Sequence, residues 1–154
     1  MNNIDNLYRQ VIMEHYKNPR NKGLVEDDSY HTLHLKNPSC GDDIYVQVKF
    51  DGDKIVDVRH NGTGCSICCS SASVMSELLK GKTIEEATDL INDFYEVVKG
   101  NEPKNEEELE EAIVYSGVSK FPARVKCASL AWKAMGAVIA GEKGELTDEW
   151  ERYQ

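Results

Sequence analysis

The most constraining feature of this sequence is a change in the spacing of its apolar residues at Gly64. Between Tyr30 and Gly62, apolar and polar residues largely alternate, which is typical of strands with one buried face. The apolar positions there are Leu33, Leu35, Ile44, Val46, Val48, Ile55, Val56 and Val58. Asp51-Gly52 favours a tight turn between the second and third groups. We therefore expect three antiparallel strands.

Past Gly64, the apolar residues recur at steps of three and four, as on one face of a helix. The first such stripe consists of Cys68, Ala72, Met75 and Leu79. Gly81 is expected to end this helix, and Thr83 with Glu86 forms a capping-box pattern that begins another. The second stripe consists of Ile84, Ala87, Leu90, Ile91, Phe94 and Val98.

Two further helices are expected near the ends of the chain. The first runs from Asn6 to Lys17, with Leu7, Val11, Ile12 and His15 on its apolar face, and Asn18-Pro19 ends it. The last begins near Pro122, a residue suited to a first helical turn. Its buried positions are Cys127, Leu130, Ala131, Ala134 and Val138.

An acidic run and the end of the chain carry weaker signals for secondary structure. The acidic run Glu106 to Glu111 predicts a solvated helix face, and Thr147 to Tyr153 predicts a final turn or two.

Strands followed by helices predict an α+β fold, a small three-stranded antiparallel sheet with helices packed on one face. A chain of 154 residues suits one domain, so we expect residues 1–154 to form a single domain.

The composition limits which partners and which cellular compartment we expect. With 18 basic against 27 acidic residues, the chain is a poor match for a nucleic-acid surface. No segment is apolar enough to span a membrane, and the first ten residues do not have the pattern of a signal peptide. Five cysteines without an export signal favour free or metal-bound thiols in the cytoplasm. Proteins are the expected partners.

Three segments place cysteines where thiolates are favoured. Cys40 and Asp42 lie in a Pro- and Gly-containing turn between two expected strands. Cys65 lies at a strand-to-helix junction, where free amides and the helix dipole lower a thiol pKa. Cys127 lies in the first turns of the last helix, after Arg124 and Lys126. Three thiolates and one carboxylate form an acceptable tetrahedral set for zinc.

The residues alone leave several alternatives open. The spacings between these cysteines are long, so a shared metal is only one possibility beside buried, unreactive thiols. Cys68 lies on an apolar stripe and suits the core, whereas Cys69 lies on the polar face with Ser73 and Ser76. The alternation of the strand does not decide between Asp42 and Asp43.

A C-x-x-C pair and the histidines are weaker candidates for a site. Cys65 and Cys68 form a C-x-x-C pair, but the βαβ pattern of a thioredoxin-like fold is missing. The four histidines, His15, His31, His34 and His60, have no metal-like spacing, and His15 is expected on a helix face near the core.

At the level of motifs, the chain resembles the U-type iron–sulfur cluster assembly family (IscU and the N-terminal domain of NifU), and within it the SufU branch. The resemblance rests on Leu7 to Met13, His15 to Asn21, Asn37 to Asp42, Gly64 to Ile67 and Phe121 to Cys127. The IscU branch has a histidine where this chain has Lys126, and the chain lacks that branch's Leu-Pro-Pro-Val-Lys motif. The long segment between Cys65 and Cys127, with its acidic run, also resembles SufU.

The resemblance implies a metal site made of Cys40, Asp42, Cys65 and Cys127, which selects Asp42 over Asp43. It implies zinc and the acceptance of sulfur from the persulfide of a pyridoxal-phosphate cysteine desulfurase of the SufS type. Cys40 would be the nucleophile, a desulfurase histidine would replace it on the metal, and Arg124 would pair with Asp42 or Cys40. Sulfur would then pass to downstream Suf scaffold proteins.

Two other functions fit the same ligands. One is a scaffold that binds iron as a [2Fe–2S] cluster and transfers it. The other is a purely structural zinc domain that binds partners. Whether the chain counts as an enzyme depends on this choice, because a sulfur acceptor acts only together with its desulfurase.

Overall fold

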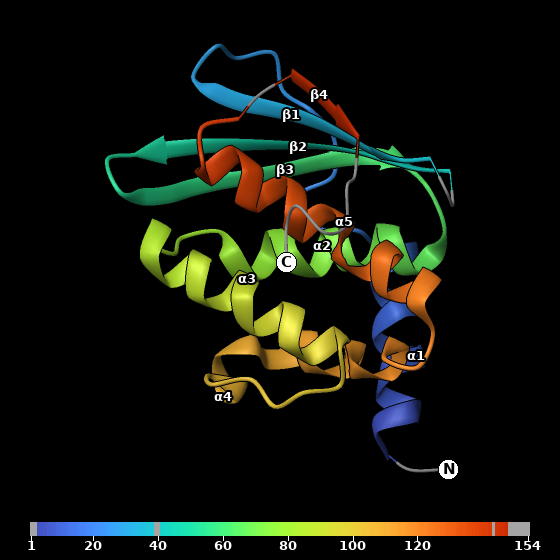
Figure 1. The fold of residues 1–154 in the computed structure, drawn as a ribbon. Helices are drawn as coiled ribbons and strands as arrows, with labels where there is room; N and C mark the ends of the chain where they lie inside the picture. Colours follow the sequence, from blue (N-terminus) through green and yellow to red (C-terminus); the bar gives the residue numbers. More distant parts are fainter. Residues whose placement is uncertain (1–2, 39–40, 143, 148–154) are drawn as a thin grey trace.

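The computed structural model describes residues 3–38, 41–142 and 144–147 of the chain. A twisted sheet forms one layer, and the helices pack beneath one of its faces (Figure 1). The predicted α+β class and the packing of helices on one face are confirmed.

The sheet has the strand order β3-β2-β1-β4. Strands β1 (Tyr30–Asn37), β2 (Asp42–Asp51) and β3 (Lys54–Thr63) pair antiparallel, as predicted. A short fourth strand, β4 (Gly144–Thr147), adds to the edge parallel to β1. Four residues that begin with glycine carry too little alternation to predict this strand. The expected turns at the end of the chain extend into residues 148–154, outside the described residues.

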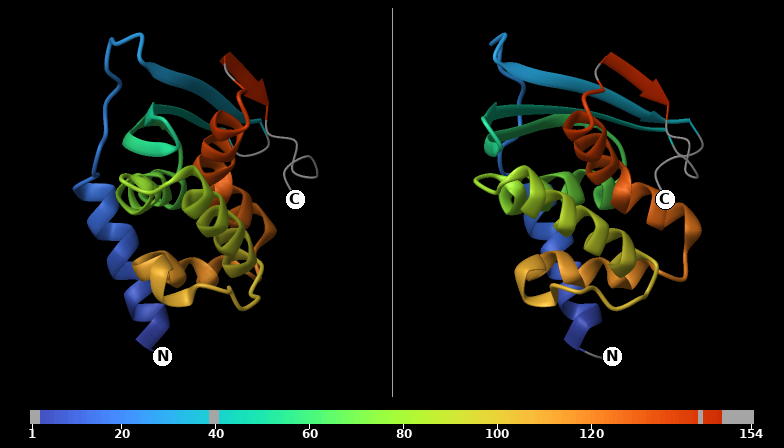
Figure 2. Two further views of the ribbon diagram at one scale, coloured as in Figure 1. Left: turned by 90° about the vertical axis from the view of Figure 1, so that its left-hand side faces the viewer. Right: turned by 60° about the vertical axis from the view of Figure 1, so that its left-hand side comes forward.

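The helices pack together on one side of the sheet, and the start of α1 lies farthest from it (Figure 2). Helix α5 packs on β1 and β2, while α2 packs on β3 and against α1. None of the helices in the described part of the chain is both long and apolar enough to cross a membrane. The helical elements are α1 (Asn3–Lys17), α2 (Ser66–Leu79), α3 (Ile84–Val98), α4 (Glu106–Leu109), the 3₁₀ helix η1 (Glu110–Val118) and α5 (Pro122–Ile139).

A stacked aromatic pair joins α3 to α5 in the core. Trp132 on α5 is fully buried, and its ring lies parallel to that of Phe94 on α3, with centroids 4.0 Å apart. The indole N–H of Trp132 donates to Ser71 Oγ at 2.9 Å, so the buried polar end of the ring is satisfied. The predicted apolar stripes of α2, α3 and α5 are buried except for Ile84, which is partly exposed at the start of α3, and this confirms their helical spacing.

Two side-chain placements differ from the sequence expectation. Leu7 was expected on the apolar face of α1 but is 48% exposed, and the neighbouring Tyr8 packs on the core instead. Ser73 and Ser76 were expected on a solvated face of α2 but are completely buried. Their hydroxyls form hydrogen bonds with α1 and the segment after it, so a hydroxyl-rich helix face is a packing surface here.

The predicted capping box at the start of α3 forms in full. Glu86 N–H donates to Thr83 Oγ1 at 3.1 Å, and Thr83 N–H donates to Glu86 Oε1 at 2.9 Å. Replacing Thr83 with alanine is expected to lower the free energy of unfolding by about 1 kcal/mol, because it leaves helix amides without an acceptor. Urea denaturation checks this, with Thr88→Ala inside the same helix as the control. Equal midpoints for the two variants would contradict the role of the cap.

Candidate metal centre

Three of the four predicted ligands converge at one end of the sheet. Asp42 begins β2, Cys65 is the N-cap of α2, and Cys127 lies in the second turn of α5. One carboxylate oxygen and the two sulfur atoms all lie within 4.8 Å of one another. Cys40, the fourth predicted ligand, lies outside the described residues.

The pairing of β2 with β3 brings the first two ligands together. Asp43 faces Thr63 in this ladder, so the chain that leaves β3 passes directly beside Asp42. The Asp42 side chain is buried, and its Oδ1 accepts a hydrogen bond from the backbone N–H of Cys65 at 3.0 Å. Asp43 instead contacts His34 on the neighbouring strand. The geometry therefore places Asp42, and not Asp43, beside the thiols.

Glycine at position 64 is a requirement of this close approach. A Cβ atom built on Gly64 would lie 2.5 Å from Asp42 Oδ1, closer than two such atoms can approach. A Cβ atom on Gly62 would lie 2.1 Å from the backbone oxygen of Asp43. The glycines of the Gly-Thr-Gly-Cys segment thus let the strand end pack tightly against the start of β2.

A hydrogen bond links the thiols of Cys65 and Cys127 and shifts their pKa values in opposite directions. A hydrogen bond from Cys127 is the largest cause that lowers the pKa of Cys65, to about 6, and the amides of Cys68 and Ile67 in the first turn of α2 assist. The same hydrogen bond, burial and the carboxylate of Asp42 raise the pKa of Cys127. At neutral pH Cys65 is therefore mainly a thiolate. The helix N-terminus predicted from the sequence contributes, but the thiol pair contributes more.

The reactivity of Cys65 in metal-free protein tests this arrangement. Alkylation by iodoacetamide at residue 65, mapped by fragment-ion mass spectrometry, should be half-maximal near pH 6, because only the thiolate reacts. Replacing Cys127 with alanine removes the donor and should move the midpoint upward. A midpoint at or above about 8 in the unmodified chain, the usual range of a free thiol, would contradict the hydrogen-bonded pair.

Tyr8 lies near the thiols and was not predicted as part of the site. Tyr8 on α1 is partly buried with its ring against Gly117, and burial raises the pKa of its phenol, with the nearby Cys65 and Cys127 adding to the rise. In the sequence, the only indication that Tyr8 packs inward is its position three residues before Val11 on α1. The guanidinium of Arg124 lies over the ring of Phe121, 4.4 Å from its centroid, and its expected pairing with Asp42 or Cys40 stays a prediction.

The remaining cysteines have different surroundings. Cys68 is buried in the core, as predicted. Cys69 is partly exposed, with its thiol 3.7 Å from the backbone oxygen of Gly64. It lines a hollow of about 450 Å³ that borders the site. Other residues around this hollow are Tyr16, Pro19, Lys22, Ile44, His60 and Thr63.

Comparison with known proteins supplies the family. A model described as the NifU-like N-terminal domain matches residues 7–128, which include every described ligand. The chain belongs to the NifU-like N-terminal domain family. This confirms the resemblance inferred from the motifs.

Several relatives of this NifU-like chain match along most of its length. It is 47% identical over 142 residues to the zinc-dependent sulfurtransferase SufU of Bacillus subtilis. That match covers 92% of this chain and 95% of the Bacillus protein. It is 40% identical over 151 residues to the iron–sulfur cluster assembly scaffold protein IscU of Streptococcus pyogenes, covering 97% and 94%. The crystal structure of FiSufU from Fervidobacterium islandicum superposes with a TM-score of 0.77 at 35% identity, covering 86% of this chain and 96% of that one.

Proposed function

We propose that this NifU-like domain is a zinc-dependent sulfurtransferase of iron–sulfur cluster assembly. The convergence of Asp42, Cys65 and Cys127 carries the proposal, and the hydrogen bond from Cys127 that lowers the pKa of the Cys65 thiol supports it. The relative that is 47% identical is named for the same activity, which supports the choice.

The donor set suits zinc. Two sulfurs and one carboxylate oxygen are ligands that zinc accepts in a tetrahedral site, and Cys40 would supply the fourth. When bound, the ion would keep the cysteine thiols deprotonated at neutral pH. The buried carboxylate of Asp42 would be the hard ligand of the set, and the Cys65 amide would hold its Oδ1 in place.

Cys40 would be the group that accepts sulfur. Its thiolate would attack the outer sulfur of a persulfide on the desulfurase, forming a new S–S bond while the old one breaks. The desulfurase cysteine would leave as a thiolate, so that atoms and charge balance. Cys65 and Cys127 are fixed on helices and would stay as ligands. Cys40, two residues before the start of β2 in the sequence, would be the ligand that exchanges for a partner side chain.

The partner would be a pyridoxal-phosphate cysteine desulfurase of the SufS type, with downstream Suf scaffolds receiving the sulfur. The hollow beside Gly64 and Cys69 leaves room for a partner segment to reach the site. We place this reaction in the cytoplasm, where reducing conditions keep thiols free.

A scaffold function is the second candidate, because another relative, 40% identical, is named as an IscU scaffold protein. The same residues would then hold a [2Fe–2S] cluster, and the oxygen ligand from Asp42 would favour its release.

A Cys40→Ala variant separates the candidates. We expect it to retain the circular dichroism spectrum of the unmodified protein and to lose stimulation of desulfurase turnover, whereas Cys69→Ala retains both. Stoichiometric zinc after anaerobic purification would support sulfur transfer, and visible absorption from iron and sulfide would support the scaffold. Unfolding of Cys40→Ala would indicate a purely structural metal.

A further inference from the structure

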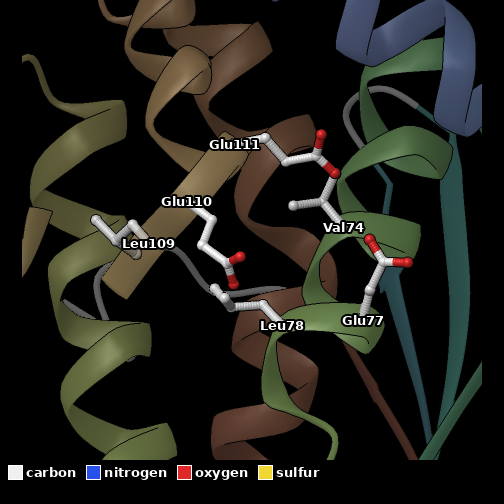
Figure 3. Close-up of a pocket in the computed structure, with 6 residues that line it drawn as sticks. All are labelled: Val74, Glu77, Leu78, Leu109, Glu110 and Glu111. Carbon is white, nitrogen blue, oxygen red and sulfur yellow. The ribbon is translucent and has the colours of Figure 1, made fainter. Parts of the chain in front are cut away.

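A second group of side chains that could bind a metal ion lies beside a hollow on the opposite side of α2 from the sheet. The hollow has a volume of about 520 Å³ and is lined by Glu77 on α2 and by Glu110 and Glu111 on η1, with Val74, Leu78 and Leu109 completing it (Figure 3). One ligand atom each from His15, Glu77 and Glu111 lies within 4.8 Å of the other two. These three residues come from α1, α2 and η1.

We propose that His15, Glu77 and Glu111 bind a divalent transition-metal cation that prefers nitrogen and oxygen ligands, such as Mn²⁺ or Fe²⁺. An imidazole with two carboxylates is a donor set that these ions accept. The proposal does not depend on the cysteine site or on the proposed sulfur transfer.

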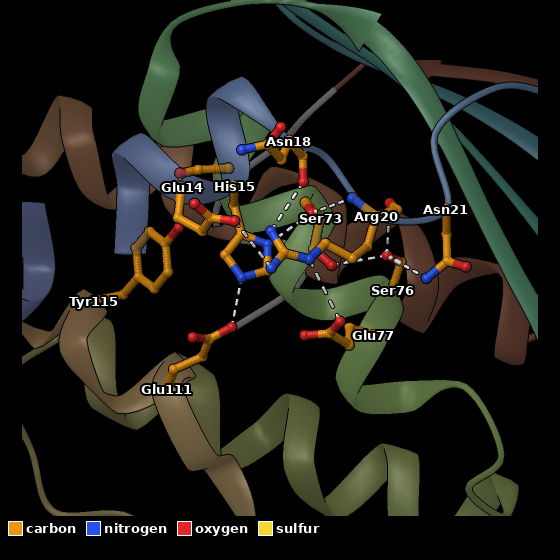
Figure 4. A network of polar contacts seen from close by, with 11 residues as sticks. Glu14, His15, Asn18, Arg20, Asn21, Ser73, Ser76, Glu77, Glu111 and Tyr115 are labelled. Carbon is orange, nitrogen blue, oxygen red and sulfur yellow. Dashed lines mark hydrogen bonds and ion pairs between the residues drawn. The ribbon is translucent and has the colours of Figure 1, made fainter. Parts of the chain in front are cut away.

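The imidazole is the fixed part of this second site. His15 is 1% exposed, and its Nδ1 lies 2.7 Å from Ser73 Oγ (Figure 4). Ser73 Oγ also accepts the backbone N–H of Arg20 at 2.8 Å, and its second lone pair can accept an Nδ1–H donor. That tautomer leaves the lone pair of Nε2 directed at the carboxylates, and a hydrogen bond at the other ring nitrogen is usual for a metal-bound histidine.

The carboxylates are close to the imidazole and free to adjust. Glu111 Oε1 lies 2.5 Å from His15 Nε2, and a cation would take the place of this direct contact. Ligand bonds of about 2.0–2.2 Å require this pair to separate slightly and Glu77 to approach. The side chains of Glu111 and Glu77 are 42% and 52% exposed, so both can rotate without disturbing the core.

Arg20 is the group with which a cation would compete. Its guanidinium lies 3.6 Å from Glu77 Oε2 and 3.3 Å from Glu14 Oε1 (Figure 4). Binding of a cation by Glu77 would leave Arg20 paired with Glu14. A bound ion would tie η1 to α1 and α2, and the last of these also carries Cys65.

Titration of the 154-residue chain, loaded with one equivalent of zinc, with Mn²⁺, followed by electron paramagnetic resonance, tests the site. We expect one saturable Mn²⁺ per chain and at least a tenfold weaker affinity in Glu111→Gln and in Glu77→Gln. The matched control is Glu110→Gln, which changes a carboxylate of the same hollow outside the ligand set and should alter the affinity less than twofold. Cys65→Ser should also leave Mn²⁺ binding unchanged.

Electron spin-echo envelope modulation supplies a direct readout of the imidazole. Bound Mn²⁺ should show coupling to one ¹⁴N nucleus, and His15→Gln should remove that coupling. Three results would overturn the proposal: no saturable binding below millimolar Mn²⁺, an equal weakening in Glu110→Gln, or bound Mn²⁺ without nitrogen coupling.

Discussion

A Cys127→Ser variant is expected to lose zinc and sulfur transfer together. Cys127 is buried beside Cys65 and Asp42, and its sulfur is one of the three donors that the structure brings together. A serine hydroxyl stays protonated at neutral pH and is a harder donor than a thiolate, so it cannot replace that ligand. Zinc affinity should fall by a factor of roughly 100 or more, beyond the 10–100-fold range known for residues that only support a ligand.

Zinc content by mass spectrometry and desulfurase stimulation measure the two losses. Serine is nearly isosteric with cysteine, so the fold should persist and circular dichroism should not change. Cys69→Ser is the matched control, because this partly exposed thiol lies one helical turn from Cys65 and outside the ligand set. Full zinc occupancy in Cys127→Ser would show that the ion is held elsewhere.

A Gly64→Ala variant is expected to weaken zinc binding without touching any ligand. The new Cβ atom would need the space occupied by Asp42 Oδ1, 2.5 Å away, so the carboxylate must move. Movement breaks its hydrogen bond from the Cys65 amide and turns the oxygen away from the thiols. Loss of a bond that orients a ligand typically lowers metal affinity by about 10–100-fold. Competition with a chromophoric chelator measures that affinity.

Gly136→Ala is the control for this substitution. Gly136 lies inside α5, and a Cβ atom there meets only Tyr95 Oη at an ordinary 3.9 Å. Alanine in a helix is favoured over glycine by about 1 kcal/mol, so this variant should keep its zinc and gain stability. Equal zinc affinities in the two variants would contradict the positioning role of Gly64.

The sheet and its helices could be predicted because their signals are local. Alternation gave β1 to β3, and the Thr83 and Glu86 pair gave the start of α3. Strand β4 has only four residues, and its pairing with β1 depends on where α5 ends.

The candidate site could be predicted only in part. The Cys65 junction pointed to a thiolate from local features, since the amides of the helix start do lower its pKa. The meeting of Asp42 with Cys127 depends on the packing of α5 against the sheet, which no spacing of residues encodes; only the family resemblance indicated it. The partly buried contact between His15 and Glu111 joins residues 96 positions apart, so the acidic run gave no sign of it.

X-ray absorption at the zinc K-edge, on protein purified without air, tests the central claim most directly. We expect one zinc per chain bound by three sulfurs at about 2.3 Å and one oxygen, from Cys40, Cys65, Cys127 and Asp42. A zinc shell of nitrogen and oxygen alone, or protein that retains its fold with no bound metal, would contradict it.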